Sequence, residues 1–255
     1  MAHDPTDLVL GRGEVYFDLF ALGTRVGSGE RYLGNTPSFQ ISRVTERAQR
    51  FRSYGGKKVE IEGVVTAEAH SLMFITDNIS MENVALWYGT QPEMVAQAAG
   101  AAIIEPFAVT PGRFIQLGKT VTPFGLRNVA NVVIRIGASV VAMLDNYEVD
   151  PTMGRIKILT GPAFEGATNI TVEFARGVAV TKQAKSKPVE RFGAVTFISK
   201  NAYGPRKNVF LPYVRLSSRG QVDLKGDEWQ QMPFEATVLK LNSITEQVYI
   251  DEMVV

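Results

Sequence analysis

Hydrophobic and polar residues alternate with a period of two along most of the chain. Val59 and Ile61 alternate with Glu60 and Glu62, and the same pattern recurs at 155–158, 170–174 and 234–238. This alternation predicts half-buried β-strands. Further strands are expected over residues 14–21, 38–45, 129–136, 194–199, 208–216 and 247–254. Together these segments predict about a dozen strands separated by glycine and proline turns.

Helical patterns are confined to one region of the sequence. Ser80 is a predicted helix cap, Val84, Trp87 and Tyr88 share one helical face, and Gly89 ends the segment. A second helix is expected from Pro92 through the alanines to Gly100. One or two short helices do not suffice for a β-α-β fold, so we predict antiparallel β-sandwich or barrel-forming sheets.

The middle of the chain reads as a separate β-rich segment. Residues 107–180 contain strand patterns only, and they lie between Glu105-Pro106 and the polar stretch 181–188. We therefore predict an inserted β-sandwich domain at residues 105–182. A core domain is then expected from residues 1–104 and 183–255.

The net charge of the chain is close to zero, but charged residues are distributed unevenly along it. The 255 residues carry a net charge of +1, which gives no overall basic character for nucleic acid. Residues 182–225 hold ten basic and two acidic side chains, whereas residues 226–255 hold one basic and six acidic. These segments are either solvated strand faces or complementary surfaces that meet on copies of the chain.

The residue content excludes several kinds of catalytic site. There is no cysteine, and the two histidines, His3 and His70, are 67 residues apart. This excludes disulfides, thiolate metal sites, cysteine nucleophiles and a histidine-rich metal centre, and we expect no cofactor. The chain starts without the positive and apolar segments of a signal peptide, and no apolar run reaches the ~20 residues of a membrane span. We expect a soluble protein kept in a reducing compartment.

Three groups of residues superficially resemble catalytic or ligand-binding motifs. Gly11-Arg12-Gly13 and Gly27-Ser28-Gly29 lack phosphate-loop spacing and read as turns. His70 has no nucleophile elbow for a hydrolase, and a structural histidine is the favoured interpretation. The acids Asp145, Glu148 and Asp150 lack the glycine and glutamate of a calcium loop, and Glu60 with Glu62 is not accompanied by a sugar cleft. We expect no enzymatic activity.

A basic and aromatic segment joins two of the predicted strands. Gly55-Gly56 is typical of a β-hairpin tip between residues 38–47 and 59–67. Such a tip suits nucleic-acid binding, or insertion into a neighbouring protein, which we favour. The candidate contact residues are Arg47, Arg50, Phe51, Arg52, Tyr54, Gly55, Gly56, Lys57 and Lys58.

Three stretches resemble the tail tube proteins of long-tailed bacteriophages. They are GRGEVYFDLF (11–20) with GERYLGNTPSFQIS (29–42), FITDNISMENVALWYG (74–89), and YGPRKNVFLPYVRLSSRGQVDLKGDEWQQMPFEATVLK (203–240). The resemblance implies two antiparallel sheets with a helix beside them. It also implies hexameric rings that stack into a hollow tube, through which the genome passes without specific binding.

The resemblance also implies roles for particular segments and partners. Residues 47–58 match a hairpin that reaches adjacent subunits and rings, residues 1–10 an N-terminal arm, and 253–255 a short C-terminal arm. The inserted domain would project outward and favour a sheathless, non-contractile tail, although an inner tube of a contractile tail is the close alternative. Expected partners are other copies and the tape measure, tail terminator and distal tail proteins, in a virion tail assembled in the host cytoplasm.

Two further expectations concern the surface of the tube. A conduit for DNA favours acidic or neutral lining residues, and Glu60 and Glu62 are the candidates for that face. The alternative function is a β-sandwich tail adhesin or carbohydrate-binding module, which favours clustered exposed aromatic residues. Against this alternative, Trp87 and Trp229 are both expected to pack in the core.

Overall fold

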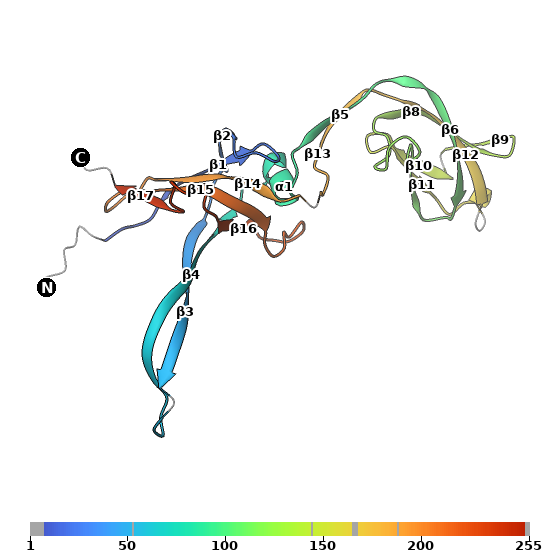
Figure 1. Ribbon diagram of the computed structural model, residues 1–255. Helices are drawn as coiled ribbons and strands as arrows, with labels where there is room; N and C mark the ends of the chain where they lie inside the picture. The colour runs from blue at the N-terminus through green and yellow to red at the C-terminus, as the bar shows by residue number, and fades with distance from the viewer. Residues whose placement is uncertain (1–7, 53, 144, 165–167, 188, 253–255) are drawn as a thin grey trace. The chain divides into compact units, whose positions relative to one another are not determined.

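The protein folds into two β-rich units. The structure, a computed structural model, describes residues 8–52, 54–143, 145–164, 168–187 and 189–252 (Figure 1). Strands make up 55% of it and helices 4%, which confirms the predicted mainly-β fold with antiparallel sheets. One compact unit, the core unit, contains the residues up to Pro92 and those from Ala184 onward. The other, the inserted unit, spans Glu93–Gln183.

An eight-stranded antiparallel sheet forms most of the core unit. In spatial order its strands are β2 (Gly27–Tyr32), β1 (Gly13–Phe20), β14 (Arg191–Ser199), β15 (Lys207–Ser218), β16 (Met232–Val238), β4 (Val59–Thr76) and β3 (Ser38–Arg52). The short strand β17 (Tyr249–Glu252) pairs with the first part of β15, and β16 pairs with its last part. Strands were therefore predicted correctly at each of these places except β2, but β3 and β4 continue well beyond their expected ends.

Alternate residues of these strands form one buried cluster. It includes Phe17 of β1, Phe74 of β4, Val195 of β14, Leu211 of β15 and Phe234 of β16, each at most 2% exposed. The rings of Phe74 and Phe234 stack with centroids 4.9 Å apart, across the pair that β4 makes with β16. The period-two alternation in the sequence thus corresponds to one buried and one outer sheet face.

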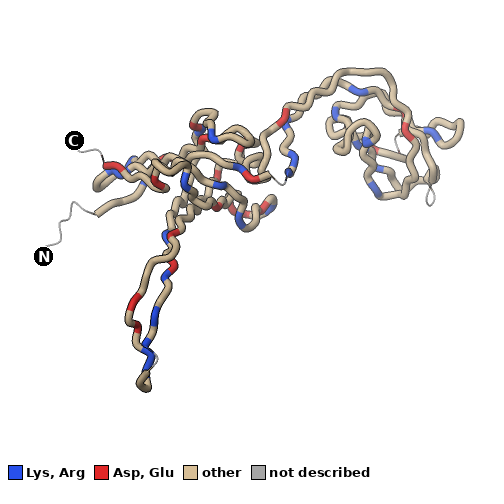
Figure 2. The backbone as a smooth tube through the Cα atoms, in the orientation of Figure 1, with Lys and Arg blue, Asp and Glu red and all other residues tan. Residues whose placement is uncertain are grey.

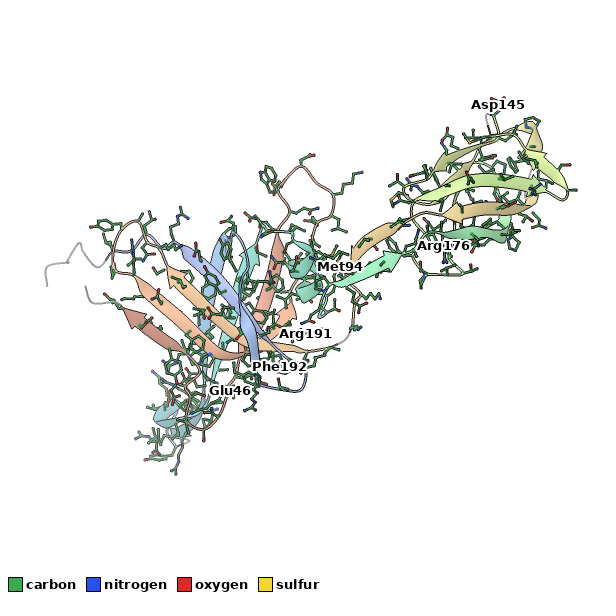
Figure 3. All side chains as sticks on the ribbon, turned by 90° about the horizontal axis from the view of Figure 1, so that it is seen from above. Glu46, Met94, Asp145, Arg176, Arg191 and Phe192 are labelled. Atoms are coloured by element: carbon green, nitrogen blue, oxygen red, sulfur yellow. The ribbon has the colours of Figure 1, made fainter. Side chains whose placement is uncertain are left out.

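The predicted first helix is confirmed as α1 (Met81–Trp87). The Ser80 side chain accepts a hydrogen bond from the Asn83 backbone N–H at 3.3 Å, which caps the helix start. Gly89, with φ +68°, ends the segment, and its carbonyl accepts a 2.9 Å bond from Nε of Arg191. This bond joins the helix end to the start of β14, and burial lowers the pKa of Arg191 (Figure 3).

The predicted second helix, from Pro92 to Gly100, is wrong. Residues Glu93–Gln97 form strand β5, which pairs antiparallel with β13 (Ala179–Gln183). The alanines and glutamines favour a helix intrinsically, but backbone pairing with β13 overrides that weak preference. Figure 3 labels Met94 in β5, the residue that pairs with Lys182.

The inserted unit contains a β-sandwich. One sheet has the order β6 (Gly100–Val109), β12 (Thr168–Arg176), β8 (Val129–Ile136) and β9 (Ser139–Val141). The other has the order β10 (Tyr147–Asp150), β11 (Arg155–Ile158) and β7 (Phe114–Gln116), with the 3-10 segment η2 (Pro162–Phe164) further along the chain. Ile134 and Phe174 of the first sheet and Ile156 of the second are fully buried in one cluster, so the sheets pack face to face.

The boundaries of the inserted unit differ from the expected 105–182. The unit begins at Glu93, so residues 93–104, which were expected in the core domain, belong to the inserted unit and contain β5 and the start of β6. The reason is the same β5–β13 pairing that replaces the expected helix. Among the described residues, no helix is long and apolar enough to cross a bilayer.

Candidate functional site

The β3–β4 hairpin extends far beyond the sheet that anchors it. The two strands pair from Ser38 with Ile75 to Arg52 with Val59, whereas β16 covers β4 only from His70 to Thr76. We call residues 43–69 the distal hairpin. Its described residues are all exposed on both strands. Figure 1 shows it as a two-stranded ribbon that leaves the sheet, and Figure 3 shows its side chains around Glu46.

The distal hairpin exposes apolar side chains that no other described part of the chain covers. Val44, Ile61 and Val64 are each 58–59% exposed, and Tyr54 is 72% exposed. An isolated two-stranded hairpin is marginally stable in water, because neither face is protected. Burial of these side chains against another molecule would stabilise the hairpin through the hydrophobic effect. The hairpin therefore has the properties of a contact element rather than of a completed domain.

The hairpin tip is basic and aromatic, as the sequence predicted. The guanidinium of Arg52 lies 4.7 Å from the ring centre of Tyr54, and the ammonium of Lys58 lies 5.8 Å from that of Phe51. Within the described part of the chain, the tip's basic side chains form no ion pair within 4.0 Å. Figure 2 shows this group of positive charges near the end of the ribbon. The tip residues are Arg47, Arg50, Phe51, Arg52, Tyr54, Gly55, Gly56, Lys57 and Lys58.

Glu60 and Glu62, the candidate lumen residues, lie in the distal hairpin beside this tip. Glu60 is paired with Phe51 and Glu62 with Arg50, so Ile61 is an extra residue at a bulge. Side chains on both faces of the hairpin are exposed around Glu60 and Glu62. The alternation of apolar and acidic residues therefore does not distinguish an inner face from an outer one. Their assignment to a lumen stays a prediction.

The core unit also has unpaired sheet edges. In the described chain, β2 is a terminal strand of the sheet, and β17 pairs only with β15. Exposed strand edges present unpaired backbone N–H and C=O groups that another strand can bind. Residues 1–7 and 253–255, the expected terminal arms, lie outside the described residues; Leu10 donates its N–H to the carbonyl of Tyr203 at 3.2 Å.

The glycine-rich segment at Gly27-Ser28-Gly29 does not offer free amides to a phosphate. The N–H groups of Ser28 and Gly29 each donate to Oδ1 of Asp18 at 2.8 Å. A carboxylate thus occupies the position that an anion would take. In the other glycine pair, Gly11 and Gly13, the N–H of the intervening Arg12 donates to Asn201 Oδ1 at 2.9 Å, and Gly13 begins β1.

His70 and Asp150, two of the residues considered in the sequence, have structural partners. Nδ1 of His70 lies 2.7 Å from Oε1 of Gln247. In the inserted unit, Asp150 accepts bonds from the Met153 N–H and from Arg155, which lower the pKa of its carboxyl. Among the described residues, no group of three or more histidine, aspartate and glutamate side chains is arranged to hold a metal ion.

The two tryptophans have different environments. Trp87 packs against the core cluster, and its Nε1–H donates to the carbonyl of Pro233 at 3.0 Å. Trp229 is 92% exposed, so its predicted core position is wrong. It lies in the segment between β15 and β16, where Arg219-Gly220 and Lys225-Gly226 break the strand pattern. These turn signals were the available indication that the tryptophan is in a loop.

A family model described as "Protein of unknown function UCP028589" matches residues 8–248. No curated protein matches the chain.

Proposed function

The chain belongs to this family of unknown function, and we propose that it is a structural, self-assembling subunit of a bacteriophage tail tube. In this proposal six copies form a ring, and rings stack into the hollow tube that conducts DNA into the host. Its partners are other copies and the tape measure, tail terminator and distal tail proteins, and its location is the virion tail. The resemblance of residues 11–20, 29–42, 74–89 and 203–240 to tail tube proteins supports this class of assembly.

The observation that carries the proposal is the uncovered distal hairpin. Its apolar side chains Val44, Phe51, Ile61 and Val64 are 44–59% exposed, on a ribbon that no other strand of the described chain covers. A repeated contact between copies would bury these side chains in every subunit but those at the ends. Self-assembly therefore accounts for an element that a monomeric protein would leave marginal.

The open edges of the sheet support a closed ring. A ring uses head-to-tail contacts, so each subunit needs two different, complementary surfaces. β2 ends the core sheet on one side and β3 on the other, and β17 pairs only with β15 in the described chain. Pairing of edges between neighbours would join the sheets and remove these exposed edges.

The charge distribution supports the same arrangement. Residues 182–225 carry an excess of basic side chains and residues 226–255 an excess of acidic ones. Oppositely charged surfaces on one chain favour specific association between copies and disfavour contact between like surfaces. Part of this charge pairs within the described chain, as Lys207 does with Glu252 and Arg219 with Glu235, so only the remainder supports contacts between copies.

A hairpin-shortened variant tests the proposal. Thr45 pairs with Glu68, so replacement of residues 46–67 by Asn-Gly should close a short hairpin without changing the buried part of the sheet. We expect this variant to fold with an unchanged thermal midpoint but to sediment as a monomer. The full-length chain should form large assemblies at the same concentration.

The matched control keeps the hairpin length and changes the inserted unit. Val140→Ser alters a side chain in β9 that is 60% exposed and lies outside the core unit. This variant should assemble like the full-length chain. A shortened variant that assembles as well as the control would contradict the proposal.

A further inference from the structure

The loop between β15 and β16 presents an exposed aromatic side chain beside a groove. We call residues 219–231 the Trp229 loop. Trp229 is 92% exposed and Leu224 is 77% exposed. The loop borders a groove of about 410 Å³ whose lining includes Ile75, Trp229 and Pro233. Such exposure of large apolar side chains is typical of a surface that another protein covers.

The Trp229 loop is acidic where the hairpin tip is basic. Residues 219–231 carry three acids, Asp223, Asp227 and Glu228, and two bases, Arg219 and Lys225, and all three acids line the groove. Arg219 lies 3.8 Å from Glu235 outside the loop, which leaves the acids in excess. Residues 47–58 carry five basic and no acidic side chains. Figure 2 shows these positive and negative groups on separate parts of the backbone. The two surfaces are complementary in charge, and arginine above an indole ring is a favourable cation–π contact.

The two surfaces of one chain lie at opposite ends of strand β4. The tip joins β4 at Val59, whereas the Trp229 loop leads into β16 at Met232, which pairs with Thr76 at the other end of β4. At about 3.3 Å per residue, these ends are roughly 55 Å apart along the strand. Figure 1 shows the ribbon leading away from β16. A tip therefore reaches a Trp229 loop only on another copy.

We propose that the basic hairpin tip of one copy docks on the Trp229 loop of the next copy. This inference rests on the proposed function and names the receptor site for the hairpin. Because donor and acceptor surfaces differ and lie at opposite ends of one strand, the contact is head-to-tail and repeats along the strand direction. It places Arg50, Arg52 and Lys57 against Asp223, Asp227 and Glu228, with Trp229 covered by the tip.

The acidic loop favours a protein occupant over nucleic acid. A phosphate backbone would be attracted to the tip but repelled by Asp223, Asp227 and Glu228. A copy of the chain satisfies both surfaces at once. Its tip also brings Phe51 and Tyr54, which are 44% and 72% exposed and suit contact with Trp229 and Leu224.

Cysteine cross-linking tests the contact directly, because the chain contains no native cysteine. A Cβ added at Gly56 in the tip or at Gly226 in the loop has no other atom within 4 Å, so both positions accept Cys. We mix full-length Gly56→Cys and Gly226→Cys chains, add a mild oxidant, and follow disulfide-linked dimers on a non-reducing gel. Val140→Cys, in the inserted unit, replaces Gly226→Cys in the control mixture.

We expect the tip and loop pair to cross-link at least about tenfold faster than the control pair, because docking raises the effective concentration of the two thiols. Equal rates would overturn the proposal. Reversal of the charges at Arg50, Arg52 and Lys57 to Glu, or at Asp223, Asp227 and Glu228 to Lys, should each abolish the difference. Mixing the two reversed chains should restore it, and failure to restore it would count against the proposed pairing.

Sedimentation and electron microscopy of the full-length chain separate this inference from the proposed function. Hollow rods that show no tip-to-loop cross-link would overturn the inference and leave the tube proposal standing. Cross-linked assemblies without a lumen would support the inference and contradict the tube proposal. A chain that neither cross-links nor assembles overturns both, whether or not its tip binds DNA.

Discussion

The rings of Phe39 and Phe197 stack with their centroids 5.1 Å apart and their planes 13° from parallel. Phe39 lies in β3 and Phe197 in β14, and three other strands separate β14 from β3 in the order of the sheet. Contact between strands so far apart in one sheet means that the sheet curves enough to bring β3 against β14. The core unit is therefore closed by side chains across the fold, with the buried cluster between its two halves.

This contact predicts that Phe197→Ala destabilises the core unit. Phe197 is half-buried, so truncation should cost about 2 kcal/mol, which is less than the loss of a fully buried phenylalanine. Ile198→Ala is the matched control, because Ile198 is the next residue of β14 and is 36% exposed. Urea unfolding of both variants measures the difference. Equal midpoints would show that ring stacking does not hold the two halves together.

A second prediction concerns the acid sensitivity of Glu14. Its carboxylate lies 2.6 Å from the ammonium of Lys200 and accepts a bond from the Tyr16 hydroxyl at 2.9 Å. These bonds lower the pKa of Glu14, so their stabilising effect is present above the carboxyl's ordinary pKa and is lost as the pH falls through the lowered value. The same ion pair raises the pKa of Lys200, so its contribution is lost only at strongly alkaline pH.

Acidification lowers the free energy of unfolding in part because Glu14 becomes protonated. The free energy of unfolding of Glu14→Gln should therefore fall less as the pH is lowered. The effect is small because the pair is near the surface and screened by solvent. Urea midpoints between about pH 6 and pH 2 give the measurement. Asp145→Asn is the control, because Asp145 is an exposed acid of the inserted unit that forms no ion pair among the described residues. This control should leave the pH profile unchanged. Coincident profiles for the two variants would contradict the assigned pair.

The inserted unit should be dispensable for folding of the core unit. Glu93 pairs with Gln183 at the base of β5 and β13, so the chain enters and leaves the inserted unit at neighbouring positions. Replacement of residues 93–183 by a short glycine-serine linker should leave thermal unfolding of the core unit cooperative and its assembly intact. Circular dichroism and sedimentation measure both properties. A variant that does not fold would contradict the independence of the two units.

The candidate lumen residues give a functional prediction. On the tail tube proposal, Glu60→Lys with Glu62→Lys in the phage should leave rings and tails intact but slow DNA passage, because lysines facing the lumen would bind the phosphate backbone. Electron microscopy checks the tails, and infectivity and ejection kinetics check the passage. Normal ejection through normal tails would remove Glu60 and Glu62 from the lumen face.

The sequence predicted local elements better than their environment. Alternation located strands such as β8 (Val129–Ile136), and the capping residue Ser80 with Gly89 located α1. Both are local signals, fixed by residues a few positions apart. The hairpin tip at Gly55-Gly56 was found for the same reason, because a tight turn depends on its own residues.

The errors concern features that depend on distant parts of the chain. β5 (Glu93–Gln97) reads as helical until β13 pairs with it. Trp229 reads as a core residue because its type is apolar, yet its exposure depends on where the loop between β15 and β16 lies. The length of the distal hairpin was also underestimated. Its described residues are exposed on both faces, so its alternation carries no information about burial.

Electron microscopy of the purified full-length protein at high concentration tests the central claim most directly. The account predicts hollow rods built of stacked rings, with sixfold symmetry in end-on views and a continuous lumen. Dispersed single particles at every concentration, or solid filaments without a lumen, would contradict it.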